Sequence, residues 1–203
     1  MHKWNMYKDY DSASKSAADF ITGIISECIE NKDVCHVILP GGNTPSRCLG
    51  YIANKALEWL KIHWYLGDER CYPKGHPERN DVMLEEFFWS RIPDTNIHLI
   101  KAEMGAEKAA EAYRNTINNI ERFDIAFLGM GEDGHTASLF PNNEALQDQR
   151  SVVPVFAAPK PPEDRVSIGI ETLKRSQYKV VLTGGKEKQK VLTEVFAGEP
   201  LPV

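Results

Sequence analysis

The 203-residue sequence lacks a run of about 18 apolar residues, the length that a membrane-spanning helix needs. Residues 1–11 are polar and aromatic, and they contain no apolar stretch like that of a secretory signal. The hydrophobic fraction of 42% and the charged fraction of 26% are typical of globular proteins. We therefore expect a cytoplasmic protein with no membrane partner.

Paired metal-binding cysteines are also missing. None of the cysteines forms a C-x-x-C pair, and none has a histidine at the spacing typical of zinc sites. The four cysteines are Cys28, Cys35, Cys48 and Cys71. In a chain of this size the pattern predicts free thiols in a reducing compartment and no metal site.

An excess of basic residues is absent as well. The formal net charge is -5 at pH 7, whereas a nucleic-acid backbone requires a basic surface. This charge argues against nucleic acid as the main partner. A small anionic ligand is compatible with it, because a few well-placed cations suffice to bind such a ligand.

The chain contains apolar segments of two kinds, and they alternate. Residues 12–30 carry apolar side chains at three- and four-residue spacing, as in a helix buried on one face. Residues 35–39 are short, mostly apolar and β-branched, as in a buried strand. The same criteria predict helices in residues 49–60, 80–91, 106–120 and 186–196, and strands in residues 63–67, 97–100, 124–128, 165–170 and 178–182. Without internal repeats or linkers, residues 1–203 are expected to form a single domain.

Strands that alternate with helices over the whole chain predict an α/β fold. We expect a mostly parallel sheet with helices on both faces, doubly wound and Rossmann-like. In such folds ligands bind beyond the carboxyl ends of the strands, where several loops converge. A functional site is therefore expected in the residues that directly follow the predicted strands.

The loop after the first predicted strand contains Gly41 and Gly42, followed by Asn43 and Thr44. Glycines let the backbone approach a ligand closely, and the N-terminus of the following helix attracts anions. An alternative interpretation is a tight turn that is capped by a hydroxyl side chain such as that of Ser46. The loop is not a Walker motif, because no Gly-Lys-Ser/Thr follows.

The loop after the second predicted strand carries three charged residues in succession, Asp68, Glu69 and Arg70. Charges directly after an apolar strand indicate either a solvated loop or a binding site. The sequence leaves both interpretations open.

The loop after the predicted strand at 124–128 holds three glycines within six residues, and it places Asp133 two residues before His135. Histidine is the natural general base near neutral pH, and a nearby carboxylate can orient it or hold its charged form. Alternatively, Asp133 caps a following helix and His135 is a hydrogen-bonded bystander. The density of Gly, Asp and His at a strand end favours a catalytic loop.

Basic residues lie near the last two predicted strands. Arg165 begins one of them, and Lys186 and Lys188 follow the other. Such residues are common on surfaces, but beside an anion-binding loop they are candidate phosphate ligands. The other histidines outside the N-terminus are expected to be structural or solvent-facing: His36, His63, His76 and His98.

These segments together resemble the 6-phosphogluconolactonase family. The matching segments, in the family's order, are Gly41-Gly42-Asn43-Thr44-Pro45, Asp68-Glu69-Arg70, residues 129–141, Arg165-Val166-Ser167 and Gly185-x-x-Lys188. The resemblance runs from about residue 12 to the end of the chain, and the motif at 129–141 is long and specific.

The resemblance implies a hydrolase of the oxidative pentose phosphate pathway that opens 6-phospho-D-glucono-1,5-lactone without a metal or another cofactor. It implies that His135 is the catalytic base, which takes a proton from the attacking water while Asp133 orients it. Asp68 is implied as a further catalytic residue. The implied substrate and phosphate ligands are Gly41, Gly42, Asn43, Thr44, Arg70, Arg165 and Lys188, with Lys188 preferred to Lys186 on motif register. We expect a small anionic sugar phosphate as the substrate and a monomer or homodimer.

The sequence departs from the family pattern in two places. Arg79-Asn80-Asp81 stands where the family usually has Ser-Asn-Tyr, so only Asn80 is carried over. The chain also ends at Val203, sooner than the family pattern predicts, and we expect a final helix or strand to be missing or reduced.

Two other functions were considered. A glucosamine-6-phosphate deaminase or isomerase shares the fold and the Asp-Gly-His element, but it has an acidic residue after the histidine, and residues 136–141 contain none. A non-catalytic sugar-phosphate sensor normally carries a DNA-binding module, and no basic helix-turn-helix segment is visible. Both are less consistent with the sequence than a lactonase.

Overall fold

A computed structural model of the chain describes residues 3–42, 45–198 and 201–203. Asn43 and Thr44, predicted as phosphate ligands, lie outside the described residues. The described helices are α1 (Tyr10–Lys32), α2 (Ser46–Ala53), α3 (Asn80–Phe87), α4 (Ala106–Ile117), α5 (Ile170–Arg175) and α6 (Gln189–Ala197). The described strands are β1 (Cys35–Leu39), β2 (Ile62–Leu66), β3 (Asp68–Arg70), β4 (Asn96–His98), β5 (Ile125–Leu128), β6 (Val152–Val155), β7 (Arg165–Ile168) and β8 (Tyr178–Val181). Short 3-10 helices are η1 (Trp59–Lys61), η2 (Trp89–Arg91), η3 (Ala102–Met104), η4 (Glu144–Leu146) and η5 (Lys186–Lys188).

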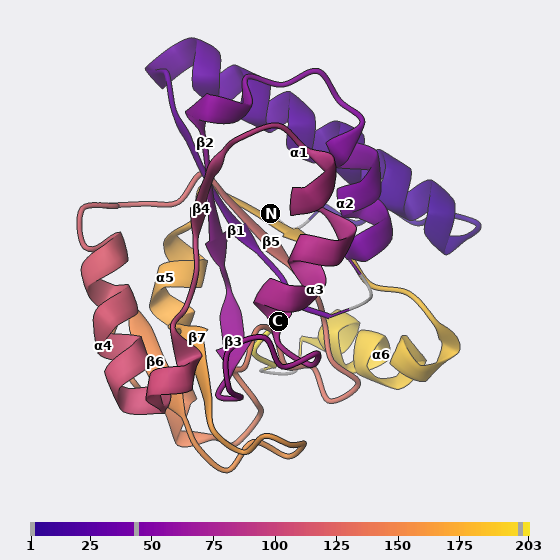
Figure 1. Ribbon diagram of the computed structural model, residues 1–203. Helices are drawn as coiled ribbons and strands as arrows, with labels where there is room; N and C mark the ends of the chain where they lie inside the picture. Colours follow the sequence, from indigo (N-terminus) through magenta and orange to yellow (C-terminus); the bar gives the residue numbers. More distant parts are fainter. Residues whose placement is uncertain (1–2, 43–44, 199–200) are drawn as a thin grey trace.

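The central sheet has five parallel strands in the order β4-β2-β1-β5-β8. Helices α1, α2 and α3 lie on one face, and α4 and α5 lie on the other (Figure 1). The predicted α/β fold with a mostly parallel sheet and helices on both faces is therefore confirmed. From β1 the chain winds outward to β2 and β4, and it then returns to β5 beside β1, so the strand order reverses between β1 and β5.

Burial on both faces explains why the central strands read as apolar runs. Val37 and Ile38 point to opposite faces of β1 and both are fully buried, as is Phe127 in β5. Burial of one such side chain contributes about 1.5–3 kcal/mol to folding. The sheet therefore has helices on both sides, as the apolar composition of its strands requires.

Helix α1 begins and ends at residues that satisfy its free backbone groups. The side chain of Asp9 accepts a hydrogen bond from the N–H of Ser12 at 2.7 Å. Asp33 adopts a left-handed conformation with φ 63° and donates its N–H to Ile29. Phe20, which the sequence placed in the buried stripe, is exposed and meets the ring of Tyr178 edge-on.

A second sheet of three antiparallel strands, β3-β7-β6, was not predicted. The segment predicted as a strand at 165–170 contributes β7 to this sheet, and Asp68–Arg70, predicted as a loop, is strand β3. The sequence missed β3 because three charged residues have little strand propensity. It missed β6 because of Pro154, which a sheet tolerates at an edge strand such as this one.

The two sheets join at Gly67, between β2 and β3. Its N–H donates to the carbonyl of Leu39 in the parallel sheet at 2.8 Å, and its carbonyl accepts from the N–H of Ile168 in the antiparallel sheet at 2.8 Å. A Cβ at this position would lie 3.0 Å from the carbonyl oxygen of Leu39. Glycine is therefore required where the chain passes from one sheet to the other.

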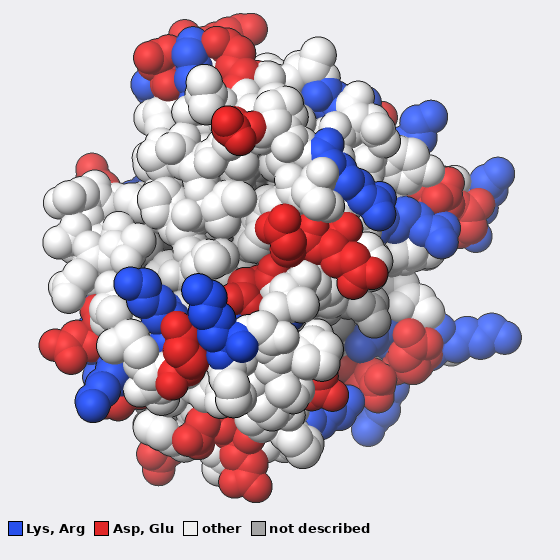
Figure 2. Space-filling model, in the orientation of Figure 1, with Lys and Arg blue, Asp and Glu red and all other residues white. Residues whose placement is uncertain are grey.

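Two predicted helices are shorter than expected. The helix predicted at 49–60 is α2, which ends at Ala53, and Leu60 lies in η1 with its side chain largely exposed. The helix predicted at 80–91 ends at Phe87. No helix in the described part of the chain is long and apolar enough to cross a membrane. On the face shown in Figure 2, acidic and basic side chains are interspersed and form no continuous basic surface.

Candidate active site

Two of the predicted site loops begin at the carboxyl ends of strands of the central sheet. Residues 40–45 follow β1, and residues 129–141 follow β5. These two strands are neighbours, and the strand order reverses between them. In doubly wound sheets this reversal opens a crevice that binds ligands. The glycine turn and the histidine loop therefore both begin at this reversal of strand order.

His135 and Asp133 form a close pair. Nδ1 of His135 lies 2.5 Å from Oδ1 of Asp133, which also accepts the backbone N–H of His135 at 3.2 Å. Partial burial acts to raise the pKa of Asp133, but the hydrogen bonds and charge of His135 hold it below its usual value. An ionised carboxylate only accepts hydrogen bonds, so Nδ1 carries the proton and Nε2 is left as a basic lone pair. Nε2 has no hydrogen-bond partner among the described residues.

Gly131 makes room for this pair. A Cβ at Gly131 would lie 2.0 Å from Nδ1 of His135 and 2.6 Å from Oδ1 of Asp133. The N–H of Gly131 donates to the carbonyl of His135 at 2.8 Å. The imidazole and carboxylate thus pack directly on bare main chain, which explains a glycine at this position.

The histidine loop is fixed by its own turns and by the C-terminal segment. Thr136 Oγ1 donates to the carbonyl of Gly129 at 2.9 Å, and the N–H of Val203 donates to the carbonyl of Gly134 at 3.2 Å. Gly134 has φ +80°, and a Cβ there would lie 2.8 Å from Leu201. Residues 129–143 form turns and an isolated bridge, so the alternative interpretation of Asp133 as a helix cap is wrong.

Asp68 is buried and is held by two side chains. Its Oδ2 accepts from Ser138 Oγ at 2.5 Å, and its Oδ1 accepts from Asn80 Nδ2 at 3.1 Å. Ser138 belongs to the histidine loop, so Asp68 ties β3 to that loop. Among the described residues Asp68 has no direct contact with His135, which instead pairs with Asp133. The two aspartates therefore have different environments, a distinction that the sequence left open.

Glu69 points away from Asp68 and Arg70, because neighbouring residues of a strand face opposite sides. Its carboxylate accepts the backbone N–H groups of Asn80 at 2.8 Å and Asp81 at 2.9 Å, at the start of α3, and also that of Arg70. Burial raises its pKa to about 7, against the effect of these hydrogen bonds. Glu69 therefore has a structural role.

Arg79 was missed as an important residue. It is buried, and its guanidinium bonds Asp81 and Glu103 at 2.8 Å each and the carbonyls of Tyr72 and Ile100. This network holds the segment between β3 and α3 in place. Arg79 and Asp81, at which the chain departs from the family pattern, therefore belong to a local ion-pair cluster. The sequence signal for this cluster was a basic residue two positions before an acidic one.

Arg70 and Arg165 lie directly opposite each other on β3 and β7. Arg165 donates to the carbonyls of Pro162 at 3.1 Å and Lys160 at 2.9 Å, and Arg70 donates to the carbonyl of Glu78. Burial lowers the pKa of Arg165; Asp68 opposes this shift and Arg70 adds to it. Like charges on opposite cross-strand positions repel, and an anion between them removes the repulsion. The pair is suited to bind a phosphate.

Phe140 connects the histidine to this arginine pair. Its ring centroid lies 4.5 Å from that of His135, and the guanidinium carbon of Arg165 lies 5.4 Å from the same centroid. The Phe140 side chain is buried. The ring therefore lies in contact with both His135 and Arg165. Sequence reasoning gave it no role, although it lies in the motif at 129–141.

The glycine turn after β1 closely approaches Asn80. A Cβ at Gly41 would lie 2.1 Å from Oδ1 of Asn80, and that buried oxygen has no hydrogen-bond partner among the described residues. Gly42 has φ +86°, a conformation that favours glycine. The space at Gly41 and the backbone conformation at Gly42 thus each favour glycine, and the prediction of both as substrate ligands stays a prediction.

Lys188 precedes α6 and is half-buried, whereas Lys186 is exposed. Val191, one turn after Lys188, lies beside Gly134, where a Cβ would approach it to 3.1 Å. Lys188 is thus three residues before a side chain that lies beside the histidine loop, and its preference over Lys186 stays a prediction from motif register.

A hollow of about 970 Å³ borders the histidine loop at Asp133 and Phe140. The residues that line it include Glu107, Asp148 and Arg150. Arg150 forms ion pairs with Glu107 at 3.0 Å and with Asp148 at 2.5 Å. An acidic wall with a neutralised arginine is unsuited to a phosphate. The arginine pair on β3 and β7 offers the better anion site.

Comparisons with known proteins agree with this geometry. The family described as glucosamine-6-phosphate isomerases/6-phosphogluconolactonase matches residues 8–203. A protein of Thermotoga maritima named 6-phosphogluconolactonase is 34% identical, over 100% of this chain and 93% of its own length. One of Synechocystis with the same name is 34% identical, over 90% and 80%.

The fold agrees as well. The crystal structure of 6-phosphogluconolactonase from Thermotoga maritima superposes with a TM-score of 0.90 at 33% identity, covering 98% of this chain and 91% of that one. The chain therefore belongs to the glucosamine-6-phosphate isomerase/6-phosphogluconolactonase family.

Proposed function

We propose that this protein hydrolyses 6-phospho-D-glucono-1,5-lactone to 6-phospho-D-gluconate, with His135 as the general base. The observation that carries this proposal is the His135–Asp133 pair, which leaves Nε2 available in the loop after β5, where the strand order reverses. The names of relatives that match the chain over nearly its full length support the same substrate.

The lactone carbonyl is already electrophilic. The reaction therefore needs a general base that activates water more than it needs a group that polarises the carbonyl. Nε2 of His135 takes a proton from water as the water oxygen attacks the carbonyl carbon. The tetrahedral intermediate then collapses, the bond to the ring oxygen breaks, and the imidazolium returns the proton to that oxygen. Asp133 keeps Nδ1 protonated and stabilises the transient imidazolium.

The remaining groups bind the substrate. Arg70, Arg165 and Lys188 hold the phosphate, which lies far from the reacting carbon and fixes the orientation of the lactone. The N–H groups of Gly131 and Gly134 already donate within the histidine loop. Other N–H groups of the glycine-rich loops are therefore the candidates to stabilise the negative charge that develops on the carbonyl oxygen. The N–H groups of the turn after β1 are the main candidates.

The test is hydrolysis of freshly generated 6-phosphogluconolactone, compared with its spontaneous rate, with and without a chelator. Acceleration that a chelator leaves unchanged supports the proposal. His135→Gln should reduce the catalysed rate by about 10²–10⁴-fold. His36→Gln is a matched control, since His36 lies near the amino end of β1. Full activity of His135→Gln with an intact fold would refute His135 as the base.

The same preparation is tested for ammonia release from glucosamine-6-phosphate. Release of ammonia would assign the chain to the isomerase branch of the family instead. We further propose that residues 1–203 form a single domain that acts in the cytoplasm as a monomer or homodimer. Gel filtration of the purified chain distinguishes the two assemblies.

A further inference from the structure

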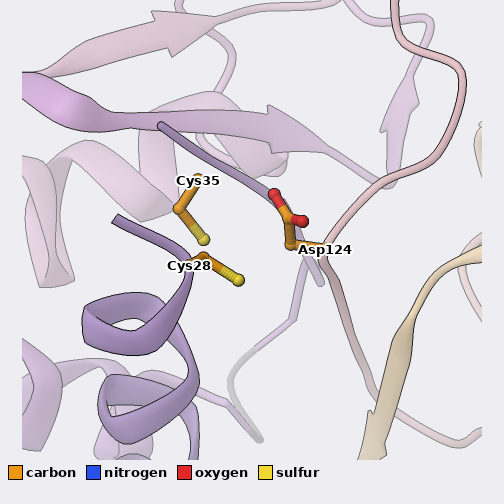
Figure 3. Close-up of side chains that lie close together, drawn as sticks. All are labelled: Cys28, Cys35 and Asp124. Carbon is orange, nitrogen blue, oxygen red and sulfur yellow. The ribbon is translucent and has the colours of Figure 1, made fainter. Parts of the chain in front are cut away.

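Three side chains with metal-binding atoms come together at the opposite end of the sheet from the active site. Cys28 lies near the end of α1, Cys35 begins β1, and Asp124 directly precedes β5. Their sulfur and carboxylate oxygen atoms all lie within 4.8 Å of one another (Figure 3). The three residues are 7%, 0% and 2% exposed. They form a buried cluster that the spacing of the cysteines in the sequence did not reveal.

The carboxylate of Asp124 is already oriented by two contacts. Its Oδ1 lies 2.6 Å from Nζ of Lys32, and its Oδ2 accepts the backbone N–H of His36 at 2.8 Å. Each carboxylate oxygen has two lone pairs, so these bonds leave capacity for a further partner. Contacts of this kind behind a metal ligand fix its direction and strengthen the site.

The spacing of the three ligand atoms is near that of a small tetrahedral site. With Zn–S of about 2.3 Å and Zn–O of about 2.0–2.2 Å, neighbouring ligand atoms lie roughly 3.4–3.8 Å apart. The cluster atoms are within 4.8 Å of one another. Decreases of at most about 1.0–1.4 Å in the distances between these atoms, within the reach of side-chain rotation, therefore bring them into coordination range.

The charge balance also permits a divalent ion. The charge of Asp124 is balanced by Lys32 at 2.6 Å, and a thiol loses its proton when it binds a metal ion. When a divalent ion replaces the two thiol protons, the sum of charges in the cluster is unchanged. The ion is therefore buried without an uncompensated charge.

We propose that Cys28, Cys35 and Asp124 form a binding site for a thiophilic divalent cation such as Zn²⁺ or Cd²⁺. The two thiols each lose a proton and form a metal–sulfur bond, one carboxylate oxygen forms the third bond, and water takes the fourth position. The ion joins the end of α1 to the starts of β1 and β5. It stabilises the fold and leaves catalysis at the other end of the sheet unchanged.

The test uses the full-length protein, reduced and metal-free. Cd²⁺ is added while the ultraviolet cadmium–thiolate charge-transfer band is recorded, and Zn²⁺ binding is followed by calorimetry. The expected result is one equivalent of metal, release of about two protons, a higher Tm and an unchanged turnover number. Cys28→Ser and Cys35→Ser should each weaken binding by about tenfold or more, while Cys48→Ser, a change at a buried cysteine outside the cluster, should not.

A second measurement does not depend on the variants being folded. In the wild-type protein, Zn²⁺ should slow alkylation of Cys28 and Cys35, read for each cysteine by mass spectrometry, and leave Cys48 and Cys71 unchanged. Absence of a charge-transfer band at one equivalent, or equal protection of all four cysteines, would overturn the proposal. Loss of lactonase activity on metal binding would contradict the separation of this site from the active site.

Discussion

Nδ1 of His135 lies 2.5 Å from Oδ1 of Asp133, and both atoms pack on Gly131 where any side chain would collide with them. This single contact determines which nitrogen of His135 is basic. It also explains why a carboxylate, a histidine and a glycine occur together within five residues of the sequence. The predictions about catalysis follow from it.

Asp133→Asn should lower kcat by about 10²–10⁴-fold with little effect on the fold, because an amide neither fixes the same tautomer nor stabilises the imidazolium. His135 holds the pKa of Asp133 low despite partial burial, so the carboxylate is ionised throughout the neutral range. Steady-state kinetics on the lactone measures the effect. Asp11→Asn, which changes an aspartate paired with Arg47 on the surface, is the control. Equal kcat for the two variants would rule out the role given to Asp133.

Gly131→Ala should displace the imidazole and reduce turnover by about 100-fold, since misplacement of a reacting group by roughly 1 Å has this effect. The control is Gly129→Ala in the same loop, where a Cβ meets nothing within 4 Å. Both variants are compared by kcat and by Tm. A loss of turnover in both would indicate a general loop effect and not the contact with His135.

Arg70→Gln and Arg165→Gln should raise KM for the phosphorylated lactone by about tenfold or more, since each removes a charge-assisted hydrogen bond worth about 1.5–3 kcal/mol. Hydrolysis of unphosphorylated gluconolactone should hardly change. Arg175→Gln, which changes an exposed residue at the end of α5, is the control. If both substrates are affected alike, the arginines do more than bind phosphate.

Ionisation of Glu69 should lower the free energy of unfolding as pH rises from about 4.5 to about 7. Its pKa is raised to about 7 by burial, from an ordinary value of 4.5, so the stabilising protonated form is complete below 4.5 and is lost as pH rises through 7. Over this pH range the free energy of unfolding should fall by up to roughly 3 kcal/mol.

This loss is measured by urea unfolding of wild type and Glu69→Gln at pH 5 and pH 8. Glutamine does not titrate, so the stability of wild type relative to the variant should be lower at pH 8. A difference that is independent of pH would show that the pKa of Glu69 is not raised.

The parallel sheet was predictable because its central strands are buried on both faces. Segments such as Cys35–Leu39 and Ile125–Leu128 are therefore mostly apolar, and that pattern is local. The same holds for the position of the histidine loop, because loops after parallel strands share one edge of the sheet. The prediction of His135, Asp133 and the glycine turn followed from these local signals.

The antiparallel sheet was not predictable in the same way. β3 is made of three charged residues, and it is a strand because β7, almost a hundred residues later, offers free backbone groups. β6 contains a proline. Helix α2 stops at Ala53 although apolar residues continue to Leu60. For β3 and β6, pairing with the distant strand β7 decided the local structure.

The sequence by itself determined the α/β class, the order of the site loops and the pairing of a carboxylate with a histidine in one glycine-rich loop. Only the tertiary structure decided that Arg70 faces Arg165, that Phe140 lies against both His135 and Arg165, and that Asp68 and Asp133 have separate partners. It also brought Cys28 and Cys35 to Asp124. The physical reason is that hydrophobic periodicity and turn chemistry act between near neighbours in the chain, whereas these contacts join residues that only the packing of the sheets brings together.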